Sequence, residues 1–352
     1  SIACVVLMFI QRPKKKNISG IILTILFSCV LSISSIIMGE INLLYLYEVF
    51  GTIIMLFMLA NIYSGDCIVH YIKAAYLYIT VIMFLNSICI YKYYPYGLYH
   101  SGLNFNYYLF GLDNVGFMYA IVGCFLGILY YIVEEKKISL KFVAVYTFIL
   151  GAYLYVRAGT ATMIILMLIL LMILYKMNLL KVLDYRKTML VCIIAYFMIV
   201  IFQTLGVFEW VLSLIKKSTG FNGRTYIWNA MFSAWPAHKW FGFGISTEIT
   251  QRYLGQNGPA WLGEIGHLHN IILEFLFKGG IIACTFFGML WAFVYKNMMK
   301  YKEHPIAILL CIETLLVWFT CMFEFRFDTY TFWFIPICLY SMKDLIHCYE
   351  KH

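Results

Sequence analysis

The chain has 352 residues, of which 63% are hydrophobic and only 12% are charged, and its formal net charge is +9. A soluble globular domain carries roughly 25% charged residues, so this composition argues against that class. Long apolar runs alternate with short basic clusters, as is typical of a polytopic membrane protein. Lipid excludes open sheet edges, and runs of about 20 residues without strict alternation favour helices over barrel strands.

The apolar runs predict about eleven helices in an all-α, polytopic transmembrane bundle. The runs cover residues 1–10 (part of a span), 18–38, 42–63, 68–91, 113–133, 140–156, 158–175, 188–206, 270–295, 305–323 and 329–342. We find no repeat and no soluble domain, so we expect residues 1–352 to form a single integral membrane domain. Because the chain starts without Met and inside a span, we also expect a further helix, or another odd number of helices, upstream.

The basic residues predict the orientation of this bundle. When the runs alternate across the bilayer, 17 of the 26 Lys and Arg residues fall on one side, including the QRPKKK cluster and the Lys136–Lys137 pair. The positive-inside rule makes that side cytoplasmic, where the basic loops also meet anionic lipid. The net charge therefore follows from topology and gives no reason to expect a nucleic-acid partner. The long loop at 207–269 and the smaller one at 92–111 are then extracytoplasmic.

The 11 cysteines are scattered through the apolar runs, with no CxxC spacing and none in the 207–269 loop. We interpret them as small buried hydrophobic residues and not as a disulfide framework or a metal site.

The long loop contains a predicted amphipathic helix that follows the turn Asn222–Gly223 and opens at Arg224. Its apolar residues recur at three- and four-residue steps, namely Ile227, Trp228, Met231 and Trp235. The loop's tryptophans suit a membrane–water interface, so we expect the loop to lie on the outer leaflet. The guanidinium of Arg224 offers a rigid fork of donors that suits two phosphate oxygens. The alternative is a solvated surface arginine, or one bound to lipid headgroups.

Other cations are placed at the same side of the bilayer. Arg157, in YVRAGTATM, lies between two apolar runs, where a charge normally faces a cavity or a partner, or snorkels to headgroups. Arg326 lies in FEFRFDTY, which joins the last two runs, and Arg252 lies in the long loop.

Two histidines stand together in GEIGHLHNIILEFLFKGG, at the start of an apolar run. In a helix, His267 and His269 point roughly 200° apart and cannot hold one ion. In an extended segment they share a face, and Glu264 becomes a possible third ligand. Because the following run is helical, we favour separate roles, with a histidine as general base or proton shuttle and Asn270 orienting its ring. The alternative is a histidine that only caps the helix.

Glu274 and Lys278 follow at a four-residue spacing with the acid first, which is the favourable order for an ion pair on a helix. A structural pair facing the bundle is the simpler interpretation, and a direct contact with substrate is the alternative.

These motifs, in this order, resemble a known family. An arginine precedes Gly-Thr-Ala at a helix start (Arg157), and a Gly-Arg-x-x-x-Trp helix follows in the long loop (Gly223, Arg224, Trp228). The turn WFGFGIS comes next, then His-Asn, Leu-Glu and a glycine pair. Over roughly residues 150–290, the chain resembles the O-antigen ligase and Wzy-type polymerase family of bacterial surface-polysaccharide enzymes.

The resemblance implies a GT-C-like architecture of about twelve helices in the bacterial cytoplasmic membrane, with an extracytoplasmic active site. It implies a glycosyltransferase that needs neither metal nor cofactor and whose donor is an oligosaccharide on undecaprenyl pyrophosphate. Arg224 and Arg157 would bind the pyrophosphate, and His269 would activate or orient the acceptor hydroxyl. The remaining expected substrate contacts are His267, Arg252, Trp228, Glu274, Lys278 and Arg326. Because His267 departs from the family pattern, the choice of reactive ring stays open.

Several functions remain open within and beyond this family. A polymerase passes the glycan to another lipid-linked repeat, whereas a ligase passes it to a lipid A core sugar. The excess of Lys over Arg leans toward a capsule or exopolysaccharide polymerase, which would work with a chain-length regulator and a flippase. The rival from another class is a flippase or transporter of the same lipid-linked glycan, but its charges would lie near the midplane. An assembly partner without chemistry is the third possibility.

Overall fold

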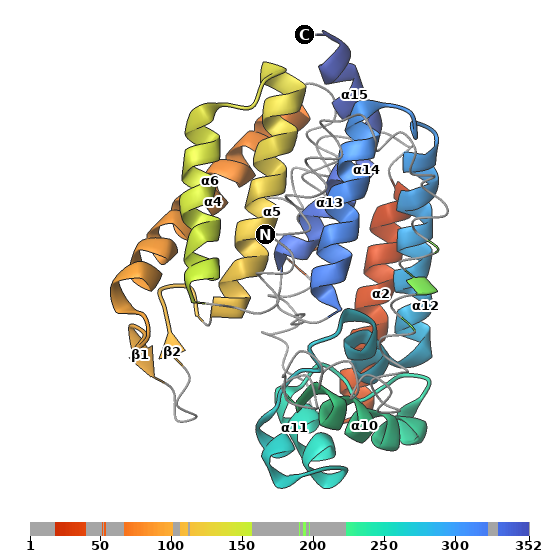
Figure 1. Cartoon of the computed structure of the whole chain (residues 1–352). Coiled ribbons are helices and arrows are strands. Elements are labelled where there is room, and N and C mark those ends of the chain that lie inside the picture. The colour runs from red at the N-terminus through yellow and green to blue at the C-terminus, as the bar shows by residue number, and fades with distance from the viewer. Residues whose placement is uncertain are drawn as a thin grey trace.

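The computed structural model describes residues 18–39, 67–100, 106–111, 113–156, 223–322 and 330–351, together with 51, 53, 190, 193, 194 and 197. The long helices run side by side as a bundle (Figure 1). The bundle elements are α2 (Ile18–Ile37), α4 (Cys67–Tyr93), α5 (Asp113–Tyr130), the π-helical turn η2 (Tyr131–Glu135), α6 (Leu140–Tyr155), α12 (Ile271–Met299), α13 (Pro305–Cys321), η7 (Tyr330–Trp333), α14 (Phe334–Tyr340) and α15 (Met342–Lys351). The others are β1 (Tyr99–His100), β2 (Asn106–Tyr107), α10 (Arg224–Ala234), η5 (Trp235–His238), α11 (Thr247–Gln256) and η6 (Ala260–Glu264).

The helical membrane fold predicted from the apolar runs is confirmed. Within the described residues, four helices are long and apolar enough to cross a membrane, at Ser19–Ile37, Ile68–Tyr93, Gly116–Glu135 and Ile271–Met299. The runs at 140–156 and 305–323 form the shorter apolar helices α6 and α13. The runs at 1–10, 42–63 and 158–175, and most of 188–206, lie outside the described residues.

The last predicted run, 329–342, is not one helix, and the prediction was wrong there. A 3-10 turn leads into the seven-residue α14, which ends at Ser341. The carbonyl of Ser341 accepts the amides of Asp344 and Leu345, so a new helix, α15, starts at once. A hydrophobicity pattern does not reveal such a break, because apolar residues continue through it.

The bundle core is aromatic and aliphatic, and many of its hydroxyl side chains bond within their own helix. The ring of Phe275 lies 5.0 Å from that of Phe27 and 4.6 Å from that of Phe287, between α2 and α12. Hydroxyl groups donate to the carbonyl four residues earlier in their own helix, as Ser28 does to Thr24 at 2.8 Å. Because lipid offers no hydrogen-bonding partner, this arrangement satisfies these hydroxyl groups within their own helix, and other polar side chains join two helices, as Asn86 Nδ2 donates to the Tyr153 hydroxyl at 3.2 Å.

Helix α12 is broken at Gly280, whose φ of 67° and ψ of −166° leave the helical region. The break frees carbonyls on one side and amides on the other. The segment 239–244 satisfies both sets, because its amides donate to the first half of α12 and its carbonyls accept from the second half. The four bonds are Phe243 N to Phe277 O (2.8 Å), Gly244 N to Lys278 O (2.8 Å), Ile281 N to Lys239 O (2.9 Å) and Ile282 N to Trp240 O (3.3 Å).

Two glycines make this close approach possible. A Cβ added to Gly280 would lie 2.2 Å from the carbonyl oxygen of Trp240, and one added to Gly242 would lie 2.4 Å from that of Phe277. Both glycines also have positive φ, which side chains disfavour. The motifs WFGFG and KGG are therefore two halves of one backbone junction.

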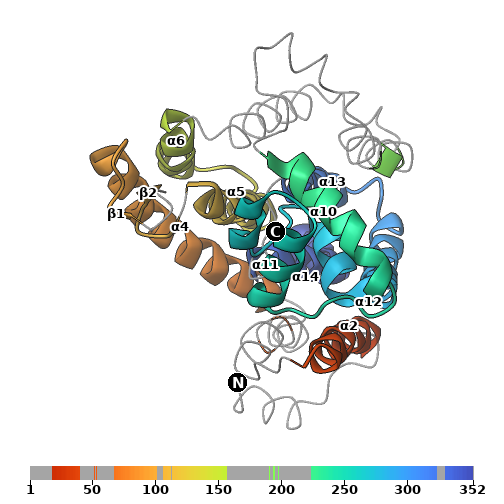
Figure 2. The same cartoon turned by 90° about the horizontal axis from the view of Figure 1, so that it is seen from below.

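Residues 223–270, which we call the loop module, fold into a separate small core at one end of the bundle. α10, predicted as an amphipathic helix, buries Ile227, Trp228 and Met231 on one face, which confirms the predicted helix. Figure 2 shows α10 and α11 lying across the end of α12 and α14, with α4 and α6 to one side. The helix α11, the turn η6 and the β1–β2 hairpin have no counterpart in the sequence prediction.

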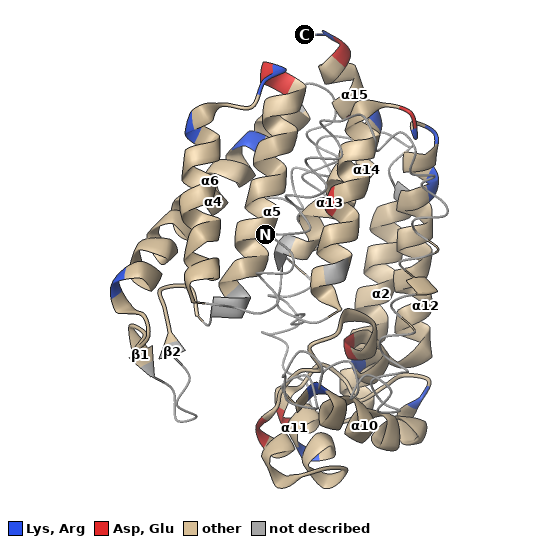
Figure 3. Cartoon of the chain, viewed as in Figure 1, with Lys and Arg blue, Asp and Glu red and all other residues tan. Residues whose placement is uncertain are grey.

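Basic residues gather at the end of the bundle that the topology predicts to be cytoplasmic, and the orientation itself stays a prediction. Lys and Arg residues gather at the connection between α5 and α6 and beyond the end of α12, at the end of the bundle opposite the loop module (Figure 3). The loop module carries charges of both signs (Figure 3).

Among the eight cysteines whose side chains the structure describes, five are buried as predicted, Cys89 and Cys284 are half-buried, and Cys29 is exposed.

Candidate functional site

The two histidines meet in a turn that precedes α12. The ring centroids of His267 and His269 lie 4.0 Å apart with the planes at 55°, and both side chains are partly exposed. Asn270 is the N-cap and α12 begins at Ile271, so neither histidine is helical. The expectation that the rings diverge was therefore wrong, because it extended the helix past its cap. His269 itself has a φ of 56°, in the left-handed region.

The residue between the histidines is held from both sides. Its amide, Leu268 N, donates to Glu274 Oε2 at 2.6 Å. Its carbonyl accepts from Trp228 Nε1 at 2.9 Å. Trp228 belongs to α10 and Glu274 to α12, so the turn is fixed between two elements that lie far apart in the sequence.

Asn270 joins the turn to the bundle. Its Oδ1 accepts the amide of Leu273 at 3.1 Å, which is the capping bond expected at a helix N-terminus. Its Nδ2 donates to the carbonyl of Met322, just after α13, at 3.2 Å. This side chain therefore caps α12 and ties it to the end of α13, and its orientation of a histidine ring stays a prediction.

Glu274 and Lys278 form the predicted ion pair, with Glu274 Oε1 2.7 Å from Lys278 Nζ. Their side chains are 0% and 2% exposed. This arrangement matches the structural interpretation, and neither side chain presents a surface on which a substrate could lie.

Arg224 opens α10, and it is only 9% exposed, which excludes the solvated surface arginine as an interpretation. It lies one helical turn before Trp228, whose indole reaches the histidine turn. Arg224 and His269 therefore belong to one compact module, connected through Trp228.

Trp228 itself is fully buried in the core of the loop module. It was expected at the membrane interface and among the substrate contacts, but its indole is used to hold the Leu268 carbonyl. The loop residues that do expose aromatic surface are Tyr226, Phe232, Trp240 and Trp261.

The remaining predicted cations are placed differently. Arg252 lies on the exposed side of α11. Arg157 and Arg326 lie outside the described residues. Whether these three meet Arg224 and His269 stays a prediction.

No group of three or more His, Cys, Asp or Glu side chains that could hold a metal ion occurs within the described residues. The histidine pair offers two imidazole nitrogens side by side, without a third ligand of that kind in this part of the chain. The expectation of a metal-independent site stays a prediction.

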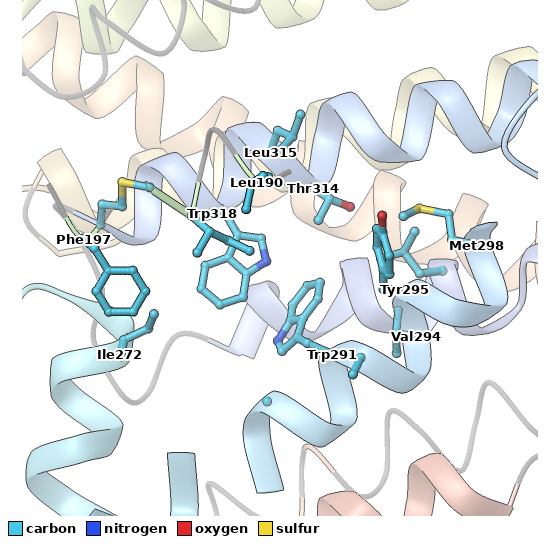
Figure 4. A pocket seen from close by; sticks show the side chains of 15 residues that line it. Leu190, Phe197, Ile272, Trp291, Val294, Tyr295, Met298, Thr314, Leu315 and Trp318 are labelled. Carbon is cyan, nitrogen blue, oxygen red and sulfur yellow. The ribbon is translucent and has the colours of Figure 1, made fainter. Parts of the chain in front are cut away.

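An apolar cavity of about 500 Å³ runs along α12 and α13 (Figure 4). Figure 4 shows Ile272 and Phe197 at one end, Met298 and Tyr295 at the other, and Trp291 and Trp318 between them. Residues with side chains of these types offer a ligand no charge, so the cavity suits hydrocarbon.

The cavity starts beside the histidine turn. Ile272, the second residue of α12, lines it, and so does Met322, whose carbonyl accepts from Asn270. The polar turn and the apolar cavity are therefore neighbours.

The fold and this site define a multi-pass membrane protein in which a polar loop module covers one end of a helix bundle. The family model described as Wzy_C, O-antigen ligase, matches residues 142–288, a range that contains α10, the histidine turn and the Gly280 junction. The chain therefore carries a domain of the O-antigen ligase family, and the resemblance predicted from its motifs is confirmed. This domain supports a membrane enzyme of the ligase and polymerase type. A comparison with curated proteins gives no match.

Sequence reasoning found the histidines, Arg224 and the ion pair, but it missed two parts of the site. It did not predict that Leu268 is held from both sides, because backbone amides and carbonyls are the same in nearly every residue and the sequence does not show their partners. It also did not connect WFGFG with KGG, although each motif contains glycines, the residues that a close backbone approach requires.

Proposed function

We propose that the protein is a polysaccharide polymerase, which transfers oligosaccharide repeats from undecaprenyl pyrophosphate to an acceptor glycan in the synthesis of a bacterial capsule, O-antigen or exopolysaccharide. The reaction takes place at the outer face of the cytoplasmic membrane and needs no metal. Arg224, with Arg157, holds the pyrophosphate, and His269 activates or orients the acceptor hydroxyl.

The observation that carries this proposal is that Arg224 and the histidine pair belong to one loop module, and that an apolar cavity begins beside this module. A lipid-linked sugar is a hydrocarbon chain joined through a diphosphate to a polar glycan. The cavity along α12 matches the hydrocarbon, and the loop module beside its end matches the head group. Neither the cavity nor the loop module requires a wide cleft for a soluble substrate.

The proposed glycosyl transfer requires a fixed positive charge and a proton acceptor. When the glycosidic bond to the pyrophosphate breaks, negative charge grows on the leaving group, and a cation already fixed in position stabilises that charge. The burial of Arg224 supports such a fixed role, since water screens a buried charge less than an exposed one. The acceptor hydroxyl loses its proton as it attacks, and an imidazole can take it near neutral pH.

A reconstituted polymerisation assay tests this proposal. Purified protein in lipid nanodiscs receives undecaprenyl-pyrophosphate-linked repeats, and product length is followed by gel and mass spectrometry. We expect Arg224→Ala and His269→Ala each to lower turnover by about a hundredfold or more, as the loss of a transition-state contact does. Near-normal turnover in either variant would remove that residue from its role.

Two matched control variants test whether the loss of turnover is specific to Arg224 and His269. Lys239→Ala removes an exposed cation from the same loop module, and His347→Ala removes an exposed histidine from α15. Both should leave turnover close to that of the unmodified protein. Release of free single repeats without chain growth, or transfer to added lipid A core alone, would contradict the polymerase and favour a hydrolase or a ligase.

A further inference from the structure

The buried ion pair of α12 calls for an explanation beyond stability. Both side chains are essentially inaccessible, and desolvation makes a buried ion pair a weak source of stability compared with apolar packing. We propose that Glu274 is a positioning residue for the turn His267–Leu268–His269, and that Lys278 pairs with the carboxylate that holds this turn. The inference rests on the proposed function for its effect on turnover, but its geometric part does not.

Each oxygen of the Glu274 carboxylate has its own partner. Oε1 lies 2.7 Å from Lys278 Nζ, and Oε2 accepts the Leu268 amide at 2.6 Å. The first contact is within α12, whereas the second leaves the helix and reaches back to the turn before it. A pair that served the helix alone would not need the second contact.

Because Leu268 lies between the two histidines, this bond affects the placement of both rings. Its amide belongs to the peptide plane that follows His267, and its carbonyl belongs to the plane that precedes His269. Glu274 holds the first plane, and Trp228 holds the second. Holding both planes fixes the positions of the two histidine Cα atoms relative to each other, and their rings lie 4.0 Å apart.

The backbone conformation of His269 explains why the turn needs the bonds from Glu274 and Trp228. Its φ of 56° lies in the left-handed region, which a residue with a side chain adopts at a cost. Without the bonds to its neighbour, the turn would relax toward an ordinary conformation, and the His269 ring would move away from His267.

Lys278 is the counter-charge of the carboxylate that holds the turn. Burying a carboxylate without a partner is costly, and the ammonium one turn away, 2.7 Å from Oε1, is that partner. The order of the pair matters, because only the carboxylate position reaches Leu268.

Exchanging the two residues separates positioning from stability. The double variant Glu274→Lys/Lys278→Glu retains an ion pair at the same spacing but puts a donor where Leu268 needs an acceptor. Glu274→Lys alone leaves two buried cations and serves as the destabilised reference. Three quantities are measured in nanodiscs: thermal unfolding, turnover with its pH profile, and the rate at which diethyl pyrocarbonate modifies His267 and His269, read by mass spectrometry.

We expect the exchange to recover most of the thermal stability that the single variant loses. Turnover should stay about tenfold or more below that of the unmodified protein, as a small misplacement of a reacting group predicts, with a changed pH profile. Both histidines should react with the reagent at altered rates. An exchange that restores turnover and modification rates together with stability would overturn the proposal.

A milder variant decides the case if the exchange does not fold. Glu274→Gln keeps the shape, but one amide cannot accept from both Leu268 and Lys278. Altered histidine modification in folded Glu274→Gln supports positioning, and unchanged modification with an unchanged pH profile overturns it. Glu303→Gln, at an exposed position beyond α12, is the control. Should the unmodified protein show no polymerisation, the proposed function fails, while the modification rates still judge the positioning.

Discussion

In the bundle, many hydroxyl side chains are satisfied within their own helix, whereas the histidine turn of the loop module is held by bonds from distant elements. In α2 and α13, hydroxyl side chains donate to the preceding turn of their own helix, as Thr24 does to Gly20 at 2.9 Å and Thr320 to Leu316 at 2.8 Å. In the loop module, the main contacts join distant elements, as when Trp228 donates to a carbonyl 40 residues away.

The difference follows from the solvent of each region. A helix surrounded by lipid has to satisfy its own backbone and side chains, because hydrocarbon offers no partner. The loop module lies outside the lipid-crossing helices, so its groups can be shared between elements and can define a precise site. The two regions meet at the broken helix α12, and the predictions below act on that boundary and on each side of it.

The largest effect is expected at the junction itself. Gly280→Ala puts a Cβ 2.2 Å from the Trp240 carbonyl oxygen and forces a side chain into a conformation at φ 67° that suits glycine. Backbone strain and overpacking together should lower the free energy of unfolding by roughly 2–5 kcal/mol. Thermal unfolding in nanodiscs measures the change.

Gly288→Ala in the same helix is the matched comparison. Its added Cβ meets no atom within 4 Å, so the usual gain of up to about 1 kcal/mol for Ala over Gly in a helix should appear. Equal effects of the two substitutions would show that segment 239–244 does not pack on α12 as described.

A second effect is expected in the apolar cavity. Gly288→Phe adds a ring where the added Cβ has open space, at the edge of the cavity lining. If the cavity holds the prenyl chain, KM for donors with a full-length chain should rise about tenfold through lost apolar contacts, and KM for short-chain analogues should change less.

Met289→Phe provides the control, because this neighbour is 49% exposed and does not line the cavity. A rise in KM that is independent of chain length, or equal for both variants, would remove the cavity from donor binding. Thermal unfolding of each variant excludes misfolding as the cause.

The smallest effect is expected at the opposite end, where His304 precedes α13. Its Nδ1 accepts the Ile306 amide at 3.2 Å, so the bond needs the neutral ring. Burial lowers the pKa of His304 from 6.5, helped by nearby Lys136 and opposed by Glu350. The unfolded chain then binds the proton more readily, so stability is present above pH 6.5 and decreases as pH falls through that value and down to the lowered pKa.

His304→Asn removes this titration and keeps a capping acceptor. The difference in unfolding temperature between the two proteins should therefore change on going from neutral to mildly acidic pH, with the unmodified protein losing more. Parallel curves for both would contradict the role of the neutral ring.

Much of the fold could be predicted because lipid imposes a simple rule. Runs of apolar residues became α2, α4, α5 and α12 within a few residues of their expected bounds. The amphipathic spacing after Arg224 became α10, and the acid-first spacing of Glu274 and Lys278 became an ion pair. These features depend on neighbours in the sequence, and helical geometry converts spacing into contact.

The site could be predicted only in its residue types. The sequence named the histidines and Arg224, but it could not show that His269 adopts a left-handed conformation or that its ring faces His267. Those facts depend on bonds from Trp228 in α10 and from Glu274 in the first turn of α12.

By themselves, composition and periodicity determined that this protein is a helical membrane bundle with a polar loop, since they record which surfaces meet lipid. The order of the sequence motifs gave the resemblance to O-antigen ligases. Only the tertiary structure decided where α12 breaks, which backbone groups of residues 239–244 fill the break, and how the histidine turn is held. The reason is that backbone amides and carbonyls are the same in every non-proline residue, so their long-range partners are chosen by the fold and not by a pattern of side chains.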